Sequence, residues 1–177
     1  MRIERQPQNI VMLDNSLGAL KRRFNDNSDK IRFIALLSPT CPLWRDKGAR
    51  AVHENVFKSF PDLDISASIV WIPILDKDNF DAAIEPAKLL NDKRVQHFYD
   101  RNKTTGIKIA KSVGWTDNVA WDIYLFYRPL VVWNNNPPEP IYWMHQLTDN
   151  WATKEKYRTG VKLKNELLVS IQKLLSE

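Results

Sequence analysis

Two apolar runs of strand length dominate the first half of the chain, at Ile31–Leu37 and at residues 65–75. Such continuous runs, rich in β-branched residues, are typical of strands that are buried on both faces of a sheet. Between them, apolar side chains recur at helical spacing over about residues 42–60, which predicts a helix. The order strand, helix, strand predicts a parallel pair of strands joined by a right-handed crossover.

The rest of the chain continues to alternate between helical and strand-like patterns. Leu17, Leu20 and Phe24 predict a short helix before the first strand, and a leucine-rich face predicts a last helix that begins near Thr159 or Gly160. We also expect helices at 79–90 and 104–113, strands at 95–99 and 122–127, and extended pieces at 130–133 and 140–145. Pro86 should kink or split the helix in which it lies.

These elements predict an α/β fold in which helices flank a mixed sheet. At 177 residues, the chain suits a single domain. With 44% hydrophobic and 27% charged residues, the composition is that of an ordinary soluble protein.

The net charge of +5 reflects basic residues that are scattered along the chain, with one triplet at Lys21, Arg22 and Arg23. This pattern favours a solvated surface over a nucleic-acid interface. No apolar run reaches the roughly 18 residues that a membrane-spanning helix needs, and the N-terminus lacks the apolar core of a signal peptide. We therefore expect a cytoplasmic protein that binds neither nucleic acid nor membranes.

Cys41 is the sole cysteine, and it falls where the first strand gives way to the predicted helix. Unpaired N–H groups and the helix dipole favour a thiolate at a helix N-terminus, and Pro42 suits a first helical turn. A single cysteine excludes an intramolecular disulfide and a cysteine-rich zinc site. The three histidines show no metal-ligand spacing, so we expect neither a metal nor another cofactor.

Residues 36–48 resemble the redox-motif turn of the thioredoxin-like superfamily, where Cys-Pro-x-Cys-Arg is a common form. Cys41, Pro42 and Arg45 match this form, whereas Trp44 stands in place of the second cysteine. Residues 97–127 resemble the later half of such domains. The resemblance therefore implies a single thioredoxin-like domain with its core at about residues 30–133 and a Trp-rich and helical C-terminal extension at about residues 134–177.

The family has a cis-proline before its later strand, and the corresponding stretch here, at residues 119–121, contains no proline. We therefore predict trans peptide bonds there. The Ser-Pro-Thr-Cys start and the Trp-Met-His-Gln segment are also similar to those of an uncharacterised bacterial group of thioredoxin-like proteins.

The resemblance implies a monothiol redox or thiol-transfer protein that uses Cys41 without a resolving cysteine. Its partner would be a small thiol or a protein thiol, and the sequence does not predict an oligomeric state. The candidate auxiliary residues are Ser38, Thr40, Trp44, Arg45, Trp121 and Asp122. The alternative is a catalytically inert binding module with an aromatic surface, supplied by Trp115, Trp121, Trp133, Trp143 and Trp151.

Two further arrangements remain open at this point. Ser38 and Arg128 match parts of a peroxiredoxin site, in which a hydroxyl and a cation stabilise the thiolate. Cys41 and His145 would form an acid–base or metal pair if folding brings them together. Each residue also has a structural interpretation, since Cys41 can be a small core residue and Asp122 a strand-edge residue.

Overall fold

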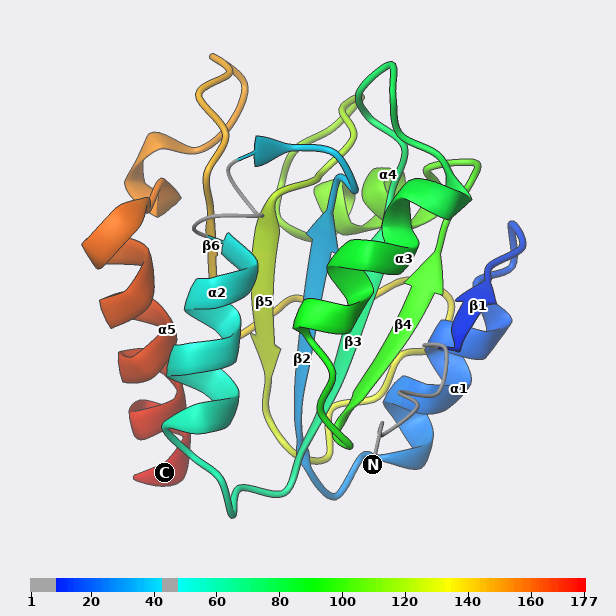
Figure 1. Ribbon diagram of the computed structural model, residues 1–177. Coiled ribbons are helices and arrows are strands. Elements are labelled where there is room, and N and C mark those ends of the chain that lie inside the picture. The colour runs from blue at the N-terminus through cyan, green and yellow to red at the C-terminus, as the bar shows by residue number, and fades with distance from the viewer. Residues whose placement is uncertain (1–8, 43–47) are drawn as a thin grey trace, which may run out of the picture.

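The computed structural model describes residues 9–42 and 48–177, and their strands form one mixed sheet with the order β1-β4-β3-β2-β5-β6 (Figure 1). The strands are β1 Ile10–Met12, β2 Ile31–Leu37, β3 Ile65–Trp71, β4 Val95–Tyr99, β5 Ile123–Tyr127 and β6 Tyr142–His145. The first four run parallel to one another, whereas β5 is antiparallel to β2 and to β6. The predicted α/β class and the predicted parallel pairing of the first two long strands are confirmed.

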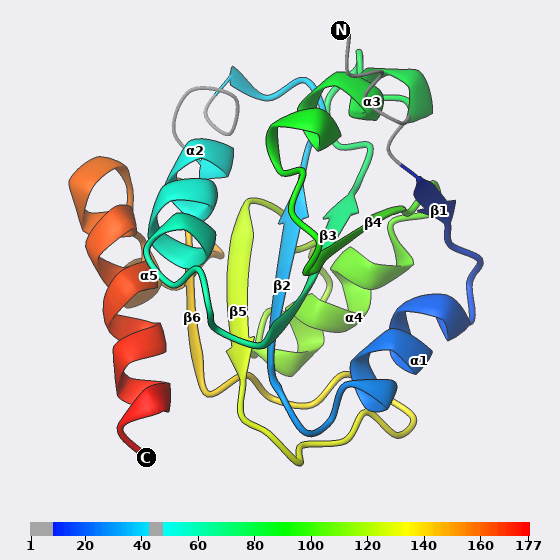
Figure 2. The same cartoon turned by 60° about the horizontal axis from the view of Figure 1, so that its bottom comes forward.

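Helices cover both faces of this sheet. They are α1 Gly18–Asp26, α2 Ala49–Val52, α3 Phe80–Leu89, α4 Thr104–Ser112 and α5 Gly160–Leu175, with a short helix η3 at Lys154–Lys156. α2 continues into wider, π-helical turns at His53–Lys58, called η2. One face carries α2, α3 and α5, and the other carries α1 and α4 (Figures 1 and 2). None of these helices is long and apolar enough to cross a membrane.

The central position of β2 in the sheet explains why its residues are apolar on both faces, with Arg32 as the exception. Phe33, Ala35 and Leu37 point to the core on the α2 side, while Ile34 and Leu36 point to the core on the α1 side. Successive side chains of a strand point to opposite faces, so a strand covered on both faces carries apolar residues at successive positions. This is the pattern from which the strand was predicted.

Several predicted elements differ in the structure. The strand predicted at 65–75 ends at Trp71, and α3 runs through Pro86 without being split. The helix predicted at 42–60 is described from Ala49 and ends at Lys58, while residues 43–47 lie outside the described part of the chain. The short edge strand β1 was not predicted, because three residues show no period.

The extended piece predicted at 130–133 is not a strand. Its backbone is held by side chains instead, since Asn25 bonds both the N–H and the C=O of Trp133. Arg32 donates to the C=O of Val131, and Leu130 takes a left-handed φ of 69°. These contacts satisfy the polar backbone groups that a neighbouring strand would otherwise pair.

Candidate functional site

Cys41 lies just beyond the carboxyl end of β2, the strand between β3 and β5. A short turn separates it from the strand, and its N–H donates to the C=O of Ser38 at 3.4 Å. The side chain is 6% exposed and belongs to a core cluster that also contains Tyr124 and contacts Trp121. The chain therefore presents a buried thiol at the end of its central strand.

Asp78 fixes the turn that leads to Cys41. Its carboxylate accepts hydrogen bonds from the hydroxyl of Ser38 at 2.6 Å and from the hydroxyl and N–H of Thr40 at 2.6 and 3.0 Å. It also accepts from the N–H groups of Ile74 and Leu75, at 2.9 and 2.8 Å, in the loop between β3 and α3. One carboxylate thus joins the loops that follow two neighbouring parallel strands.

The charge state of Asp78 follows from these donors. Burial alone would raise the pKa of Asp78, but the hydroxyls of Ser38 and Thr40 and the two backbone N–H groups stabilise the carboxylate more strongly. The pKa of Asp78 therefore lies below its usual value, and its carboxylate is ionised at neutral pH. We call this carboxylate, with its five hydrogen bonds to the two loops, the Asp78 clamp.

A second carboxyl, that of Asp122, lies at the same end of the sheet. β5 pairs antiparallel with β2, and Ile123 is opposite Leu36, so the residue before β5 is beside the end of β2. The Oδ1 atom of Asp122 accepts from the hydroxyl of Tyr124 at 2.9 Å and from the side-chain amide of Gln146 at 3.0 Å. This network is buried, since Asp122 is 2% exposed.

The surroundings of Asp122 are strained and incompletely satisfied. Its φ of 47° is left-handed, and its Oδ2 atom has no hydrogen-bond partner among the described residues. Desolvation raises the pKa of Asp122, and Tyr124 and Gln146 lower it by a smaller amount. The pKa of the Tyr124 hydroxyl is also raised, first by burial, then by Asp122, with a further contribution from Cys41. Tyr124 thus interacts electrostatically with both Cys41 and Asp122.

The loop before Asp122 contains the stretch at residues 119–121 for which trans peptide bonds were predicted. Its peptide bonds at Val119, Ala120 and Trp121 are trans, as predicted. Gly106 on α4 allows the loop to pack closely, because a Cβ atom there would lie 2.8 Å from the C=O of Ala120. Trp121 is half-buried and contacts the core on both faces of the sheet.

The structure separates other residues that the sequence suggested as partners of Cys41. Arg128 follows β5, at the opposite end of the sheet from Cys41, and pairs with Glu177. The peroxiredoxin-like pairing of Ser38 with Arg128 is therefore wrong, because β5 runs antiparallel to β2. Trp44 and Arg45 lie outside the described residues.

The ring of His145 contacts backbone groups through both of its nitrogens and so has a structural role. Its Nδ1 atom accepts from the N–H of Leu147 at 3.0 Å, and its Nε2 atom lies 2.8 Å from the C=O of Thr153. Both ring nitrogens are thus used, and burial lowers the pKa of the ring. Neither nitrogen remains for Cys41 or for a metal ion, and the described residues contain no group of three or more side chains that could ligate one.

Apart from Trp121, the tryptophans of the predicted aromatic surface fall into two sets and do not form one continuous surface. Trp133 packs edge-on against Phe24 beneath α1. Trp115 contacts Trp143 and Trp151 edge-on, and of these three only Trp151 is classed as exposed. Next to this second set is a cavity of about 330 Å³, whose lining residues are Leu147, Thr148, Asp149, Ala152, Lys154 and Tyr157.

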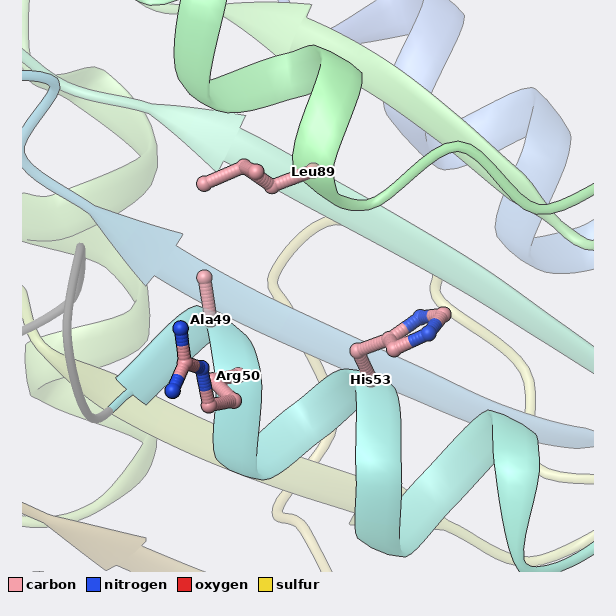
Figure 3. A pocket seen from close by; sticks show the side chains of 4 residues that line it. All are labelled: Ala49, Arg50, His53 and Leu89. Atoms are coloured by element: carbon pink, nitrogen blue, oxygen red, sulfur yellow. The ribbon is translucent and has the colours of Figure 1, made fainter.

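A smaller cavity of about 120 Å³ lies between α2 and α3 (Figure 3). Ala49 and Leu89 provide its apolar surface, and Arg50 and His53 line it from the α2 side. This space is too small for a drug-sized ligand.

Three polar residues of the site were missed by sequence analysis. Asp78 directly precedes Asn79, the N-cap of α3, and so looked like part of an ordinary helix start. Tyr124 reads as a core strand residue. Gln146 belongs to the Trp-Met-His-Gln segment, which gave the best signal that this region matters.

Comparisons with known proteins found little. No protein-family model matches the chain, and no curated protein matches it. Among solved structures, the solution structure of a thioredoxin-like protein in the oxidized form is similar. It is 13% identical, the alignment covers 80% of either chain, and the TM-score is 0.45.

The thioredoxin-like description of the fold accordingly rests on the chain's own topology. A parallel β2–α2–β3 unit is followed by the antiparallel strands β5 and β6 and by a C-terminal helix. The sequence predicted this order with one further extended piece, at 130–133, which is not a strand in the structure.

Proposed function

We propose that the protein is a thioredoxin-like monothiol redox or thiol-transfer protein and that Cys41 is its nucleophile. The observation that supports this best is the placement of the thiol. Cys41 follows the central strand, the Asp78 clamp orders the turn before it, and Tyr124 links it electrostatically to a buried carboxyl.

The chemistry begins when the Cys41 thiolate attacks one sulfur of a small disulfide. A mixed disulfide forms at Cys41, the original S–S bond breaks, and the second sulfur leaves as a thiolate that takes up a proton. The Tyr124 hydroxyl belongs to the same buried cluster as Cys41 and donates to Asp122, so this pair would be the first acceptor of the thiol proton.

Completion of the cycle needs a thiol from outside the chain. Cys41 is the sole cysteine, so no internal thiol can attack the mixed disulfide. An external small thiol or a partner protein's thiol would attack the sulfur that is bound to Cys41, release the thiolate of Cys41 and leave with the other sulfur. The protein would therefore transfer thiol groups rather than form an internal disulfide.

Mild oxidation with glutathione disulfide, followed by mass spectrometry of the intact protein, tests the proposal. We expect one added glutathione on the native protein and its release by excess reduced glutathione. A Cys41→Ser variant is the control and should remain unmodified. A wild-type protein that stays unmodified while a small control thiol reacts would refute the redox proposal.

The second candidate is an inert binding module, and the burial of Cys41 together with the cavity between Leu147 and Tyr157 favours it. Leu147 and Ala152 form a buried apolar surface there, and Asp149 and Lys154 offer charges of both signs. A protein of this kind would bind its ligand equally well after Cys41→Ser, whereas thiol transfer would be abolished.

A further inference from the structure

Basic side chains converge on a cleft at the end of the sheet that is remote from Cys41. The cleft has a volume of about 260 Å³ and lies where the parallel strands β2, β3 and β4 begin. Its charged lining residues come from separate parts of the chain: Arg23 from α1, Lys30 from the residues before β2, Asp64 from those before β3, and Lys93 and Arg94 from those before β4. In Figure 1 this is the end from which β3 and β4 start.

The positive charge of the cleft is only partly neutralised. Lys30 pairs with Asp64 at 3.1 Å, and Arg94 pairs with Asp92 at 2.8 Å. Arg23 and Lys93 form no ion pair with any residue in the described part of the chain. Two cations therefore face this cleft without a carboxylate of their own.

Arg23 is the more unusual of these two cations. Its Nη2 atom donates to the C=O groups of Ala67 and Arg94, at 3.3 and 2.9 Å. These two hydrogen bonds fix the guanidinium where β3 and β4 begin. Its Nε atom is buried and has no hydrogen-bond partner within the described residues. Burial also lowers the pKa of the guanidinium. The guanidinium is therefore partly desolvated and is held by carbonyl oxygens without a carboxylate, and a bound anion would offset part of the desolvation cost.

We propose that this cleft binds a small ligand with a phosphate or pyrophosphate group, held by Arg23 and Lys93. A guanidinium presents several N–H donors in one plane, which matches the oxygens of a phosphate. Lys93 is exposed at the rim of the cleft and adds a second positive charge. Its flexible side chain can adjust to the position of the bound phosphate. The volume accommodates a phosphate or pyrophosphate group and is below the range of typical drug-sized sites, about 300–1,000 Å³.

The site is independent of the proposed thiol chemistry. It lies at the amino ends of the parallel strands, whereas Cys41 lies beyond the carboxyl end of β2. Loss of one function would therefore leave the other measurable.

Titration of the full chain with inorganic pyrophosphate at low ionic strength, followed by the amide resonances, tests this proposal. We expect saturable shifts at Ile65, Lys93 and Arg94, and none at Cys41. Lys93→Gln should weaken binding about tenfold, since it removes one charge-assisted contact. Arg23→Lys keeps the charge but loses the planar fork, and it should weaken binding several-fold.

The matched control is a double variant, Lys111→Gln with Lys162→Gln, which removes two exposed cations that do not line the cleft. It should bind pyrophosphate as the wild type does. Equal weakening by the control and by Lys93→Gln would mean that only the net charge attracts the anion, and this would overturn the proposal. Shifts confined to other residues, or no saturable shifts, would also overturn it. Lys93 is exposed and without a hydrogen bond or ion pair among the described residues, so its variant should fold normally.

Discussion

Two carboxyls at the Cys41 end of the sheet, in the loops before α3 and before β5, are held in opposite ways. Asp78 is half-buried and accepts five hydrogen bonds, two of them from backbone N–H groups of its own loop. Asp122 is almost fully buried, accepts two side-chain hydrogen bonds on one oxygen and none on the other. The pKa of Asp78 is accordingly lowered and that of Asp122 is raised.

The different surroundings of Asp78 and Asp122 indicate different roles for the two carboxyls. A carboxylate that is surrounded by donors is a stable anchor, because protonating it would lose those hydrogen bonds. A buried carboxyl with an unpaired oxygen and a left-handed backbone costs stability, and such costs are concentrated at functional sites. We therefore assign the ordering of the turn to Asp78, whereas Asp122 has the buried, strained and incompletely bonded carboxyl that is common at functional sites.

Removal of the anchor should have the largest effect. Asp78→Ala leaves the buried hydroxyl of Ser38 and the backbone N–H groups of Thr40, Ile74 and Leu75 without their acceptor. We expect the free energy of unfolding to fall by about 3 kcal/mol. Denaturant unfolding measures this, with Asp76→Ala in the same loop as the control, because Asp76 is exposed and should change stability by less than about 0.5 kcal/mol. Equal losses for both variants would refute the anchor.

Removal of the Tyr124 hydroxyl should have an intermediate effect. Tyr124→Phe keeps the buried ring but deprives Asp122 of one of its two donors. We expect a loss of about 1.5 kcal/mol of unfolding free energy at neutral pH, from the charge-assisted hydrogen bond. The loss should shrink when the same substitution is made together with Asp122→Asn, because the hydroxyl then no longer bonds a charged group. A double-mutant cycle measures this coupling, and strictly additive effects would contradict it.

Asp122→Asn should have the smallest effect on stability of the three variants, and it should stabilise the fold rather than destabilise it. A folded-state pKa above the unfolded value contributes stability that is present below the unfolded pKa of about 3.9 and is lost as the pH rises through the folded pKa. Asp122→Asn removes this dependence. It should therefore unfold like the wild type at acid pH and be more stable by about 1 kcal/mol at neutral pH. A variant that is less stable than the wild type at neutral pH would show that the ionised carboxylate is well solvated in the fold.

The elements of the fold that could be predicted are those that show a hydrophobic period within their own stretch of sequence. β2 and β4 were predicted at their observed bounds, and α5 at its observed start, because a buried strand or an amphipathic helix leaves its period in the sequence. The segment at 130–133 was mispredicted because its backbone is bonded by the side chains of Asn25 and Arg32, which are distant in sequence.

The candidate site was predictable only in part, for a similar reason. Cys41 was identified from its place after a strand and Asp122 from the resemblance, and both lie at one end of the sheet. Asp78 was missed because its role depends on Ser38 and Thr40, which are about forty positions away along the chain. The suggested pairings of Cys41 with Arg128 and with His145 failed because strand direction and the hydrogen bonds of a ring are three-dimensional properties.

The rate of alkylation of Cys41 in the native protein tests the central claim most directly. Labelling with iodoacetamide across pH, at increasing denaturant concentrations well below the unfolding transition, reports whether the thiol reacts from the folded state. The account predicts a labelling rate that is nearly independent of denaturant. It also predicts that the pH midpoint of this rate lies below the ordinary cysteine pKa of about 8.5, as for a nucleophile at a strand–helix junction. Labelling that occurs only in proportion to the unfolded fraction would show that Cys41 is an inert core residue, and it would contradict the account.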